Sequence, residues 1–403
     1  MNGPLPQNRR NEGHILWPLW LSVLGLMVVS AMFIFSTTGG IETSRGVPWY
    51  LWTATRQVVA FGVGLAAVAG MMLVDYSRLA RWAMVGYWLS IALLVAVYLV
   101  GTSRNGARRW LDLGPVQFQP SELAKLAFLF AMANFLARPA SELRSKGVFV
   151  RSLALTLAPL LLILKQPDLG SSLVFLPITL VMMVVAGVPT RFIGRLLAGA
   201  VLVAGLVVAD ILFAPEGWRL IRLQDYQRER LLVYFDADFA PGSATPEQRQ
   251  RAAQRKRQMS WNVEQALISV GSGGLTGKGW REGTQHRLGY LPRLGAHNDF
   301  IFSVIAEERG FLGSLAVVTL YGIILFTGIK TAGESRDRLG RLLAVGVVTL
   351  LFIHIFVNIG MNIKLMPVTG IPLPLLSAGG TSVLCSLIAV GVLQNIHLYR
   401  KRY

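Results

Sequence analysis

The chain contains 403 residues, of which 53% are hydrophobic and only 15% charged, and its formal net charge is +18. This composition excludes a set of soluble domains and indicates that the lipid bilayer is the solvent. A nucleic-acid partner is not expected, because the positive charge is spread over short loops that carry no binding motif.

Ten apolar runs are long enough to cross the membrane, since a helix needs ~20 apolar residues to span ~30 Å of hydrocarbon. They lie at residues 16–36, 56–75, 80–101, 122–137, 150–165, 169–187, 194–213, 300–329, 340–361 and 378–399. We therefore predict an all-α membrane protein, a single polytopic domain over residues 1–403 with ten transmembrane helices. The first run lacks a small-x-small cleavage site and is expected to remain in the mature protein.

The basic residues of the short loops predict the orientation. An even number of spans puts both termini on one side, where the ends and short loops carry 17 Arg and Lys residues, against 7 on the opposite side. Because basic loops are retained in the cytoplasm, both termini are predicted to be cytoplasmic. Cys385 is the only cysteine, which excludes an intramolecular disulfide.

One connection, residues 214–298, is much longer than the others and is predicted to be extracytoplasmic, between the seventh and eighth spans. Loops of this length are usually functional. Its Gln/Arg-rich part, residues 242–259, is typical of a charged helix or of a disordered insert. The many basic residues of the loop either contact lipid headgroups or attract an anionic lipid substrate.

Asp299 lies where this loop enters the eighth span. A carboxylate at such a boundary could act as a general base on a sugar hydroxyl, or it could cap the helix that follows. Glu307 and Glu308 lie further along the same run, where an unpaired carboxylate is costly. They are therefore functional acids or members of ion pairs. The ion-pair partners considered are Lys364, Lys125 and Arg309.

Several basic residues could compensate a phosphate charge. Glu122 and Lys125 form an i, i+3 pair at the start of the fourth span, after a compact basic turn that contains Arg108 and Arg109. These residues either anchor the membrane edge or face a cavity. Lys278 follows a Gly-rich stretch whose amides could bind a pyrophosphate. A Walker nucleotide site is excluded, because neither Ser nor Thr follows that lysine.

Residues 364–380 connect the last two predicted spans and contain three prolines and three glycines. This composition is incompatible with regular helix, and such backbone is tolerated at membrane depth only where it is buried or lines a wet cavity. We predict that the segment forms a wall of the functional site.

Seven ordered motifs resemble those of the SEDS family of cell-wall proteins, along nearly the whole chain. The motifs are Gly106-Ala107-Arg108-Arg109-Trp110, Gln119-Pro120-Ser121-Glu122-Leu123-Ala124-Lys125, Lys165-Gln166-Pro167-Asp168-Leu169-Gly170, Tyr226-Gln227 with Arg230, Gly271-Ser272-Gly273-Gly274, His297-Asn298-Asp299-Phe300-Ile301-Phe302, and Met366-Pro367-Val368-Thr369-Gly370-Ile371-Pro372-Leu373-Pro374. Gly283-Thr284-Gln285 favours the RodA branch of the family over the FtsW branch. The family usually has Leu-Pro-Glu-x-His-Thr-Asp before the eighth span, and here that Glu is missing and Asn298 replaces Thr.

The resemblance implies a peptidoglycan glycosyltransferase of the bacterial inner membrane, which polymerises lipid II at the outer face and releases undecaprenyl pyrophosphate. It also implies a class B penicillin-binding protein as partner and Asp299 as the catalytic aspartate. Since pyrophosphate leaves without protonation by a carboxylic acid, one general base is enough. A divalent cation, Mg²⁺ or Mn²⁺, could assist. The predicted substrate-binding residues are Arg108, Arg109, Glu122, Lys125, Arg230, Lys278, His297 and Lys364.

Two rival functions suit the same sequence. A transporter or flippase of a lipid-linked precursor would also carry ten spans and buried charges, and a noncatalytic scaffold of the cell-wall elongation machinery would need no base. Two observations favour the enzyme. Matching discontinuous half-helices are not evident in the sequence, and Asp299 is predicted at the membrane interface instead of the midplane.

Overall fold

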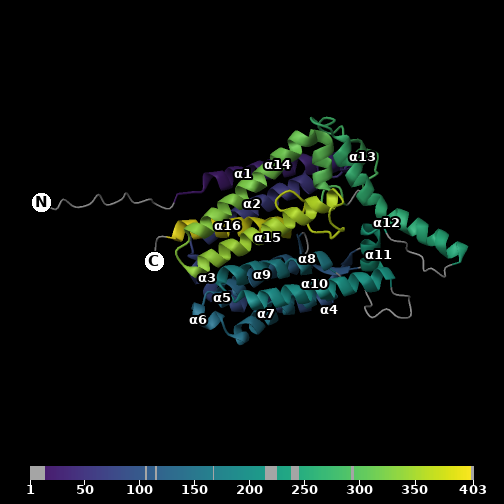
Figure 1. Cartoon of the computed structure of the whole chain (residues 1–403). Coiled ribbons are helices and arrows are strands. Elements are labelled where there is room, and N and C mark those ends of the chain that lie inside the picture. Colours follow the sequence, from purple (N-terminus) through teal and green to yellow (C-terminus); the bar gives the residue numbers. More distant parts are fainter. Residues whose placement is uncertain are drawn as a thin grey trace.

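The computed structural model describes residues 14–104, 107–113, 116–166, 168–213, 225–236, 245–291 and 295–400. Over these ranges the chain is mostly helical, and the long helices run side by side in one bundle (Figure 1). Nine segments of the described chain are long and apolar enough to cross a membrane. They are α1 (Trp17–Ser44), α2 (Thr53–Met72), α4 (Ala83–Val100), α7 (Lys146–Lys165), α8 (Leu169–Leu173) together with α9 (Phe175–Ala186), α10 (Thr190–Phe213), α14 (Ile301–Glu334), α15 (Arg338–Asn362) and α16 (Gly380–Tyr399).

The predicted fourth span is α5 (Pro120–Leu136), which has 17 residues. At 1.5 Å per residue this helix is roughly 26 Å long, so it is shorter than the ~30 Å hydrocarbon core. It contacts α4, α15 and α9 and buries most of its residues. The predicted membrane-spanning architecture is thus found for nine segments, and α5 is a short helix packed within the bundle.

The remaining helices are short or lie in the long connection. Between the spans are η1 (Trp49–Leu51), α3 (Tyr76–Arg81) and α6 (Ala140–Leu143), and between α10 and α14 are α11 (Asp225–Tyr234), α12 (Pro246–Ser272) and α13 (Thr284–Arg287). Helix α12 begins at a capping box formed by Thr245 and Gln248. Of the two alternatives for residues 242–259, the part from residue 245 onward is therefore a charged helix. It extends away from the bundle in Figure 1.

A small three-stranded antiparallel sheet accompanies the predicted helical architecture. Its strands, in the order β1-β2-β3, are β1 (Thr102–Arg104), β2 (Ala107–Leu113) and β3 (Val116–Phe118). Arg109 and Trp110 belong to strand β2, and not to the compact turn predicted from the sequence. Strands this short carry little periodicity, and the pairing of β2 with both neighbours satisfies backbone groups outside the helices.

The core lies around α15 and α16, which bury most of their residues, whereas α10 exposes apolar side chains along its length. Val201, Leu202, Val203 and Leu206 are all more than half exposed. Apolar side chains on this scale suit contact with lipid tails. The part of the bundle that can hold a polar site is therefore the α5, α14, α15 and α16 region.

Helix α14 is interrupted at Gly310, whose φ is 65° and ψ is −159°, a conformation that only glycine adopts readily. The loop that follows α12 fills the interruption with backbone hydrogen bonds. Lys278 N donates to Glu307 O (3.0 Å) and Phe311 N donates to Gly274 O (2.9 Å). The Gly-rich loop thus replaces part of the helical hydrogen-bond ladder and holds α12 against α14.

We expect Gly310→Ala to lower stability strongly. A Cβ at this position would overlap the backbone of Leu275 and Gly277, and with the dihedral strain the cost should be at least ~2 kcal/mol. The matched control is Gly322→Ala in the same helix, where the new methyl meets no heavy atom within 4 Å and should be neutral or stabilising by ~1 kcal/mol. Melting temperatures of the detergent-solubilised variants measure both. A Gly310→Ala protein as stable as Gly322→Ala would contradict the interpretation.

Candidate functional site

The proline-rich segment, defined as residues 364–379, contains no helix, as predicted. It lies against the residues that precede α14. Ala378 N donates to His297 O (2.9 Å), and Ser377 Oγ donates to Asn298 O (2.7 Å). These contacts bring together two motifs that are about 80 residues apart in sequence.

Asp299 lies at the junction of this segment with α14 and α15. Its carbonyl oxygen accepts hydrogen bonds from Asn358 Nδ2 (3.2 Å) and Asn362 Nδ2 (3.0 Å), both on α15. Its Oδ2 atom is 3.8 Å from the position that a Cβ would take at Gly370, which has a φ of 75°. The carboxylate and the proline-rich segment are therefore close neighbours.

The structure does not support Asp299 as the cap of the following helix. The N-cap of α14 is Phe300, and its side chain makes no capping hydrogen bond. Asp299 itself is only partly buried. Asp299 therefore lies one residue before the N-cap position of α14, and its role as a general base stays a prediction.

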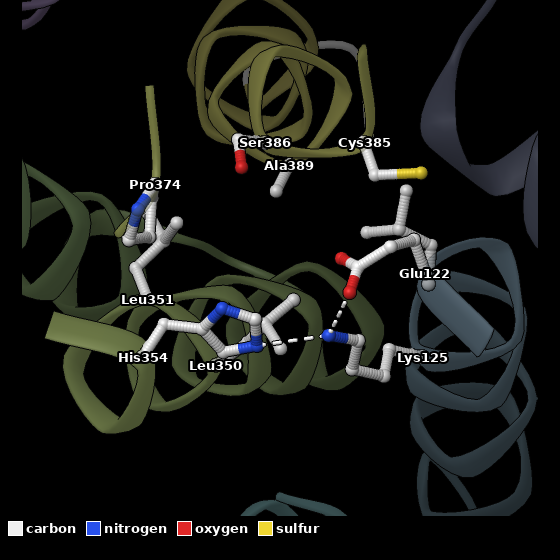
Figure 2. Close-up of a pocket in the computed structure, with 10 residues that line it drawn as sticks. Glu122, Lys125, Leu350, Leu351, His354, Pro374, Cys385, Ser386 and Ala389 are labelled. Atoms are coloured by element: carbon white, nitrogen blue, oxygen red, sulfur yellow. Dashed lines mark hydrogen bonds and ion pairs between the residues drawn. The ribbon is translucent and has the colours of Figure 1, made fainter. Parts of the chain in front are cut away.

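Glu122 and Lys125 form the predicted i, i+3 ion pair, with 2.7 Å between Lys125 Nζ and Glu122 Oε1. Both residues are buried, with exposed fractions of 4% and 1%. A third residue, His354 of α15, completes the group, since its Nε2 is 3.0 Å from Lys125 Nζ. Figure 2 shows this group facing Cys385 and Ser386 of α16 across a cavity.

This cavity is too small for a sugar. The volume open to the centre of a water molecule is about 10 Å³, which is close to the minimum that holds one water. Its other lining residues include Pro374 of the proline-rich segment and Leu351 of α15. In this conformation the cavity connects the buried ion pair to the proline-rich segment, and a lipid-linked sugar would have to lie outside it.

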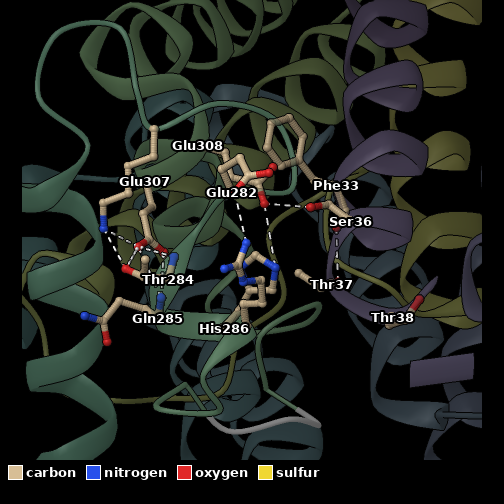
Figure 3. A network of polar contacts seen from close by, with 12 residues as sticks. Phe33, Ser36, Thr37, Thr38, Glu282, Thr284, Gln285, His286, Glu307 and Glu308 are labelled. Carbon is tan, nitrogen blue, oxygen red and sulfur yellow. Dashed lines mark hydrogen bonds and ion pairs between the residues drawn. The ribbon is translucent and has the colours of Figure 1, made fainter. Parts of the chain in front are cut away.

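Lys278 is engaged by a second group of polar residues, shown in Figure 3. Its Nζ lies 2.6 Å from Oε1 of Glu307, which is fully buried. The same carboxylate accepts from Thr284 N (2.8 Å) and Gln285 N (3.2 Å). The partner of Glu307 is therefore Lys278, and not one of the three basic residues considered from the sequence.

Glu308 contacts a different helix. It accepts a hydrogen bond from Ser36 Oγ of α1 (2.6 Å), and His286 Nε2 lies 3.7 Å away from it. Burial lowers the pKa of His286 below its usual value and outweighs the opposite effect of the Glu307 carboxylate. Together the two glutamates fasten α13 to α14 and α1, and the ion-pair alternative fits Glu307, whose partner is Lys278.

The Gly-rich loop, which the sequence indicated as a possible pyrophosphate site, has backbone amides that are already hydrogen-bonded within the protein. The amides of Lys278 and Gly279 donate to the carbonyls of Glu307 and Glu308, at 3.0 Å each. These two amides already have partners, because the interrupted α14 leaves its carbonyl groups unbonded within the helix. The amides of Lys278 and Gly279 could bind a pyrophosphate only if these backbone bonds opened.

The structure describes the side-chain contacts of some of the other predicted site residues and not of others. Arg109 donates from Nε to Gln166 O (3.1 Å), and its guanidinium is 3.8 Å from Asp168. Lys364 is exposed at the start of the proline-rich segment, and His297 meets that segment through its backbone. The side chains of Arg108 and Arg230 lie outside the described part of the structure.

Comparison with known proteins identifies the chain's relatives. Residues 16–402 match the FtsW/RodA/SpoVE family model, described as "Cell cycle protein". The chain belongs to this family. It is 35% identical to the peptidoglycan glycosyltransferase MrdB of Escherichia coli K12, over 96% of this chain and 95% of that protein. It is 30% identical to the peptidoglycan glycosyltransferase RodA of Treponema pallidum, over 94% and 96% of the two chains.

Solved structures of the FtsW/RodA/SpoVE family share the fold. A chain from a peptidoglycan synthase complex, studied for the coordination of polymerization and crosslinking, superposes with a TM-score of 0.75 at 30% identity, covering 96% of this chain and 99% of that one. The crystal structure of RodA from Thermus thermophilus gives a TM-score of 0.66 at 29% identity, over 96% and 98%. The likeness to the Thermus thermophilus protein fits the RodA resemblance found in the sequence.

His354, Asn358 and Asn362 were not among the site residues predicted from the sequence of this FtsW/RodA/SpoVE member. All three are buried polar residues of α15, and they contact the Lys125 pair, the proline-rich segment and Asp299. A signal was present in their spacing of four residues, which places them on one face of an otherwise apolar helix.

Proposed function

We propose that this protein is a peptidoglycan glycosyltransferase that polymerises lipid II, with Asp299 as its general base. The observation that carries the assignment is the position of Asp299. Its backbone is held by two asparagines of α15 and its carboxylate adjoins the non-helical proline-rich segment. In a family whose relatives carry the name peptidoglycan glycosyltransferase, this is the acid best placed to meet a substrate.

The proposed reaction is an inverting displacement. The 4-hydroxyl oxygen of the acceptor N-acetylglucosamine attacks the anomeric carbon of the donor, and the bond from that carbon to the pyrophosphate oxygen breaks. Asp299 accepts the hydroxyl proton as the new glycosidic bond forms. Undecaprenyl pyrophosphate leaves with its bonding electrons, so a carboxylic acid is not needed to protonate it.

Cations compensate the charge of the departing pyrophosphate in this proposal. Lys125, Arg109 and Lys364 are candidates among the residues with described side chains, and Arg108 and Arg230 stay predictions from the sequence. Lys278 and Glu122 support the site through their ion pairs, and His297 through its backbone contact with Ala378.

A divalent cation has no ready-made protein site in the described ranges, which hold no group of three His, Cys, Asp or Glu side chains suited to a metal. Mg²⁺ commonly binds one or two carboxylates and completes its shell with substrate phosphates and water. The described residues thus form no three-ligand metal site, and the proposed steps do not use a metal.

We further propose the setting of the reaction. Both termini face the cytoplasm of a bacterial inner membrane, and Asp299 with α11, α12 and α13 faces the outside. The bias of basic residues toward the terminal loops supports this orientation. A class B penicillin-binding protein is the proposed partner, which is supported by the similarity to a chain from a peptidoglycan synthase complex.

A polymerisation assay tests the function against its rivals. Purified protein in liposomes is given labelled lipid II, and both glycan polymer and transbilayer movement of the lipid are measured. The enzyme yields polymer. Movement of the lipid without polymer would establish the flippase instead. If neither polymer nor lipid movement is detected, with or without a class B penicillin-binding protein, the scaffold is the remaining function.

A further inference from the structure

The C-terminal half of helix α15 carries three buried polar side chains, His354, Asn358 and Asn362, which we call the α15 stripe. They are four residues apart, so they share one face of the helix. Their exposed fractions are 4% or less. Polar groups buried at membrane depth are costly unless they have hydrogen-bond partners, and the partners of the stripe include Lys125, the proline-rich segment and Asp299.

At its N-terminal end the stripe contacts the buried ion pair. The ammonium of Lys125 has only donors, so His354 Nε2, 3.0 Å from it, must accept. The remaining ring proton of a neutral imidazole is then on Nδ1, which is 3.4 Å from the carbonyl oxygen of Pro372. His354 therefore joins Lys125 to the proline-rich segment, and its tautomer follows from its two neighbours.

At its C-terminal end the stripe holds the backbone of Asp299. Asn358 and Asn362 both donate to the Asp299 carbonyl, and Asn358 also donates to Ile371 O (2.8 Å). Asn362 in turn accepts from Ser303 Oγ of α14 (2.5 Å). The orientation of the Asp299 backbone is thus fixed by side chains of α15.

We propose that the α15 stripe is a positioning element for glycosyl transfer. It fixes the Asp299 carboxylate relative to the proline-rich segment and to Lys125, although none of its three residues touches the reacting atoms. The inference rests on the proposed function of Asp299. A misplacement of ~1 Å at a catalytic group can lower a rate by ~10²-fold, so the effect of loosening the stripe is measurable.

The first test compares two isosteric substitutions, Asn358→Asp and Asn395→Asp. Asn395 of α16 is a matched control, because it is equally buried and its Nδ2 donates to two carbonyls, Met71 O and Val74 O, both at 2.8 Å. Each substitution replaces two donors by a carboxylate. We expect both proteins to melt at a lower temperature, and only Asn358→Asp to lose ~10²-fold in kcat with little change in KM.

The second test separates the two contacts of His354. In His354→Gln the amide can reach the place of Nε2 and keep the contact with Lys125, whereas in His354→Asn it can reach only the place of Nδ1 and keep the contact with Pro372. If the stripe positions Lys125, polymerisation falls at least ~10-fold further in His354→Asn than in His354→Gln. This comparison stays informative if Asn358→Asp does not fold.

The outcomes distinguish this inference from the proposed function. A wild-type kcat in Asn358→Asp overturns the positioning role. The role is also overturned if Asn395→Asp loses as much kcat as Asn358→Asp for the same decrease in melting temperature. Equal rates for the two His354 variants overturn it as well. In each of these cases an inactive Asp299→Asn protein would leave the proposed function intact, because the stripe would then be a packing feature only.

Discussion

Asp299→Asn should abolish glycan polymerisation while leaving the protein folded. An amide cannot accept the proton of the acceptor hydroxyl, and loss of a general base lowers a rate by ~10²–10⁴-fold. The fold should persist because Asn358 and Asn362 bind the backbone carbonyl of residue 299, which the substitution retains. Polymer formed from labelled lipid II and the melting temperature of the same preparation are the two measurements.

The control for this variant is Asp236→Asn. Asp236 follows α11, between α10 and α14, and its carboxylate is 2.9 Å from Lys256 Nζ on α12. That lysine lowers the pKa of the exposed aspartate, and the pair should be worth little in water. Asp236→Asn is expected to polymerise at the wild-type rate. Full-rate synthesis by Asp299→Asn would refute the assignment of the base.

Lys125→Met should destabilise the protein and reduce polymerisation. The substitution leaves the Glu122 carboxylate buried without its 2.7 Å partner, and breaking a buried pair in this way costs ~3–5 kcal/mol. The double variant with Glu122→Gln and Lys125→Met removes both charges, so most of the lost stability should return. Melting temperatures of the two single variants and the double variant form a double-mutant cycle.

Activity in the same cycle tests whether Lys125 serves more than folding. If its charge compensates the leaving pyrophosphate, the double variant regains stability and remains at least ~10-fold slower than wild type in polymerisation. Wild-type synthesis by a stable double variant would show that the pair has a structural role alone. The contact of Lys125 with His354 links this result to the α15 stripe.

The sequence by itself predicted the membrane architecture and singled out Asp299 as the candidate catalytic acid. Apolar runs predict spans because the thickness of the bilayer fixes the length of helix that can cross it, and nine described segments meet that requirement. The prolines of residues 364–379 predicted a non-helical wall, because proline lacks the amide that a helix needs. The motif around Asp299 indicated a catalytic acid through its resemblance to a family.

Apart from the predicted i, i+3 pair of Glu122 and Lys125, the partners of the buried charges were decided only by the tertiary structure. Lys125 and His354 are 229 residues apart, and Lys278 and Glu307 come from different elements. Local patterns report which side chains share a helix face, but they do not report which helix packs against that face. For the same reason the α15 stripe became visible only when α15, α14 and the proline-rich segment were seen together around Asp299.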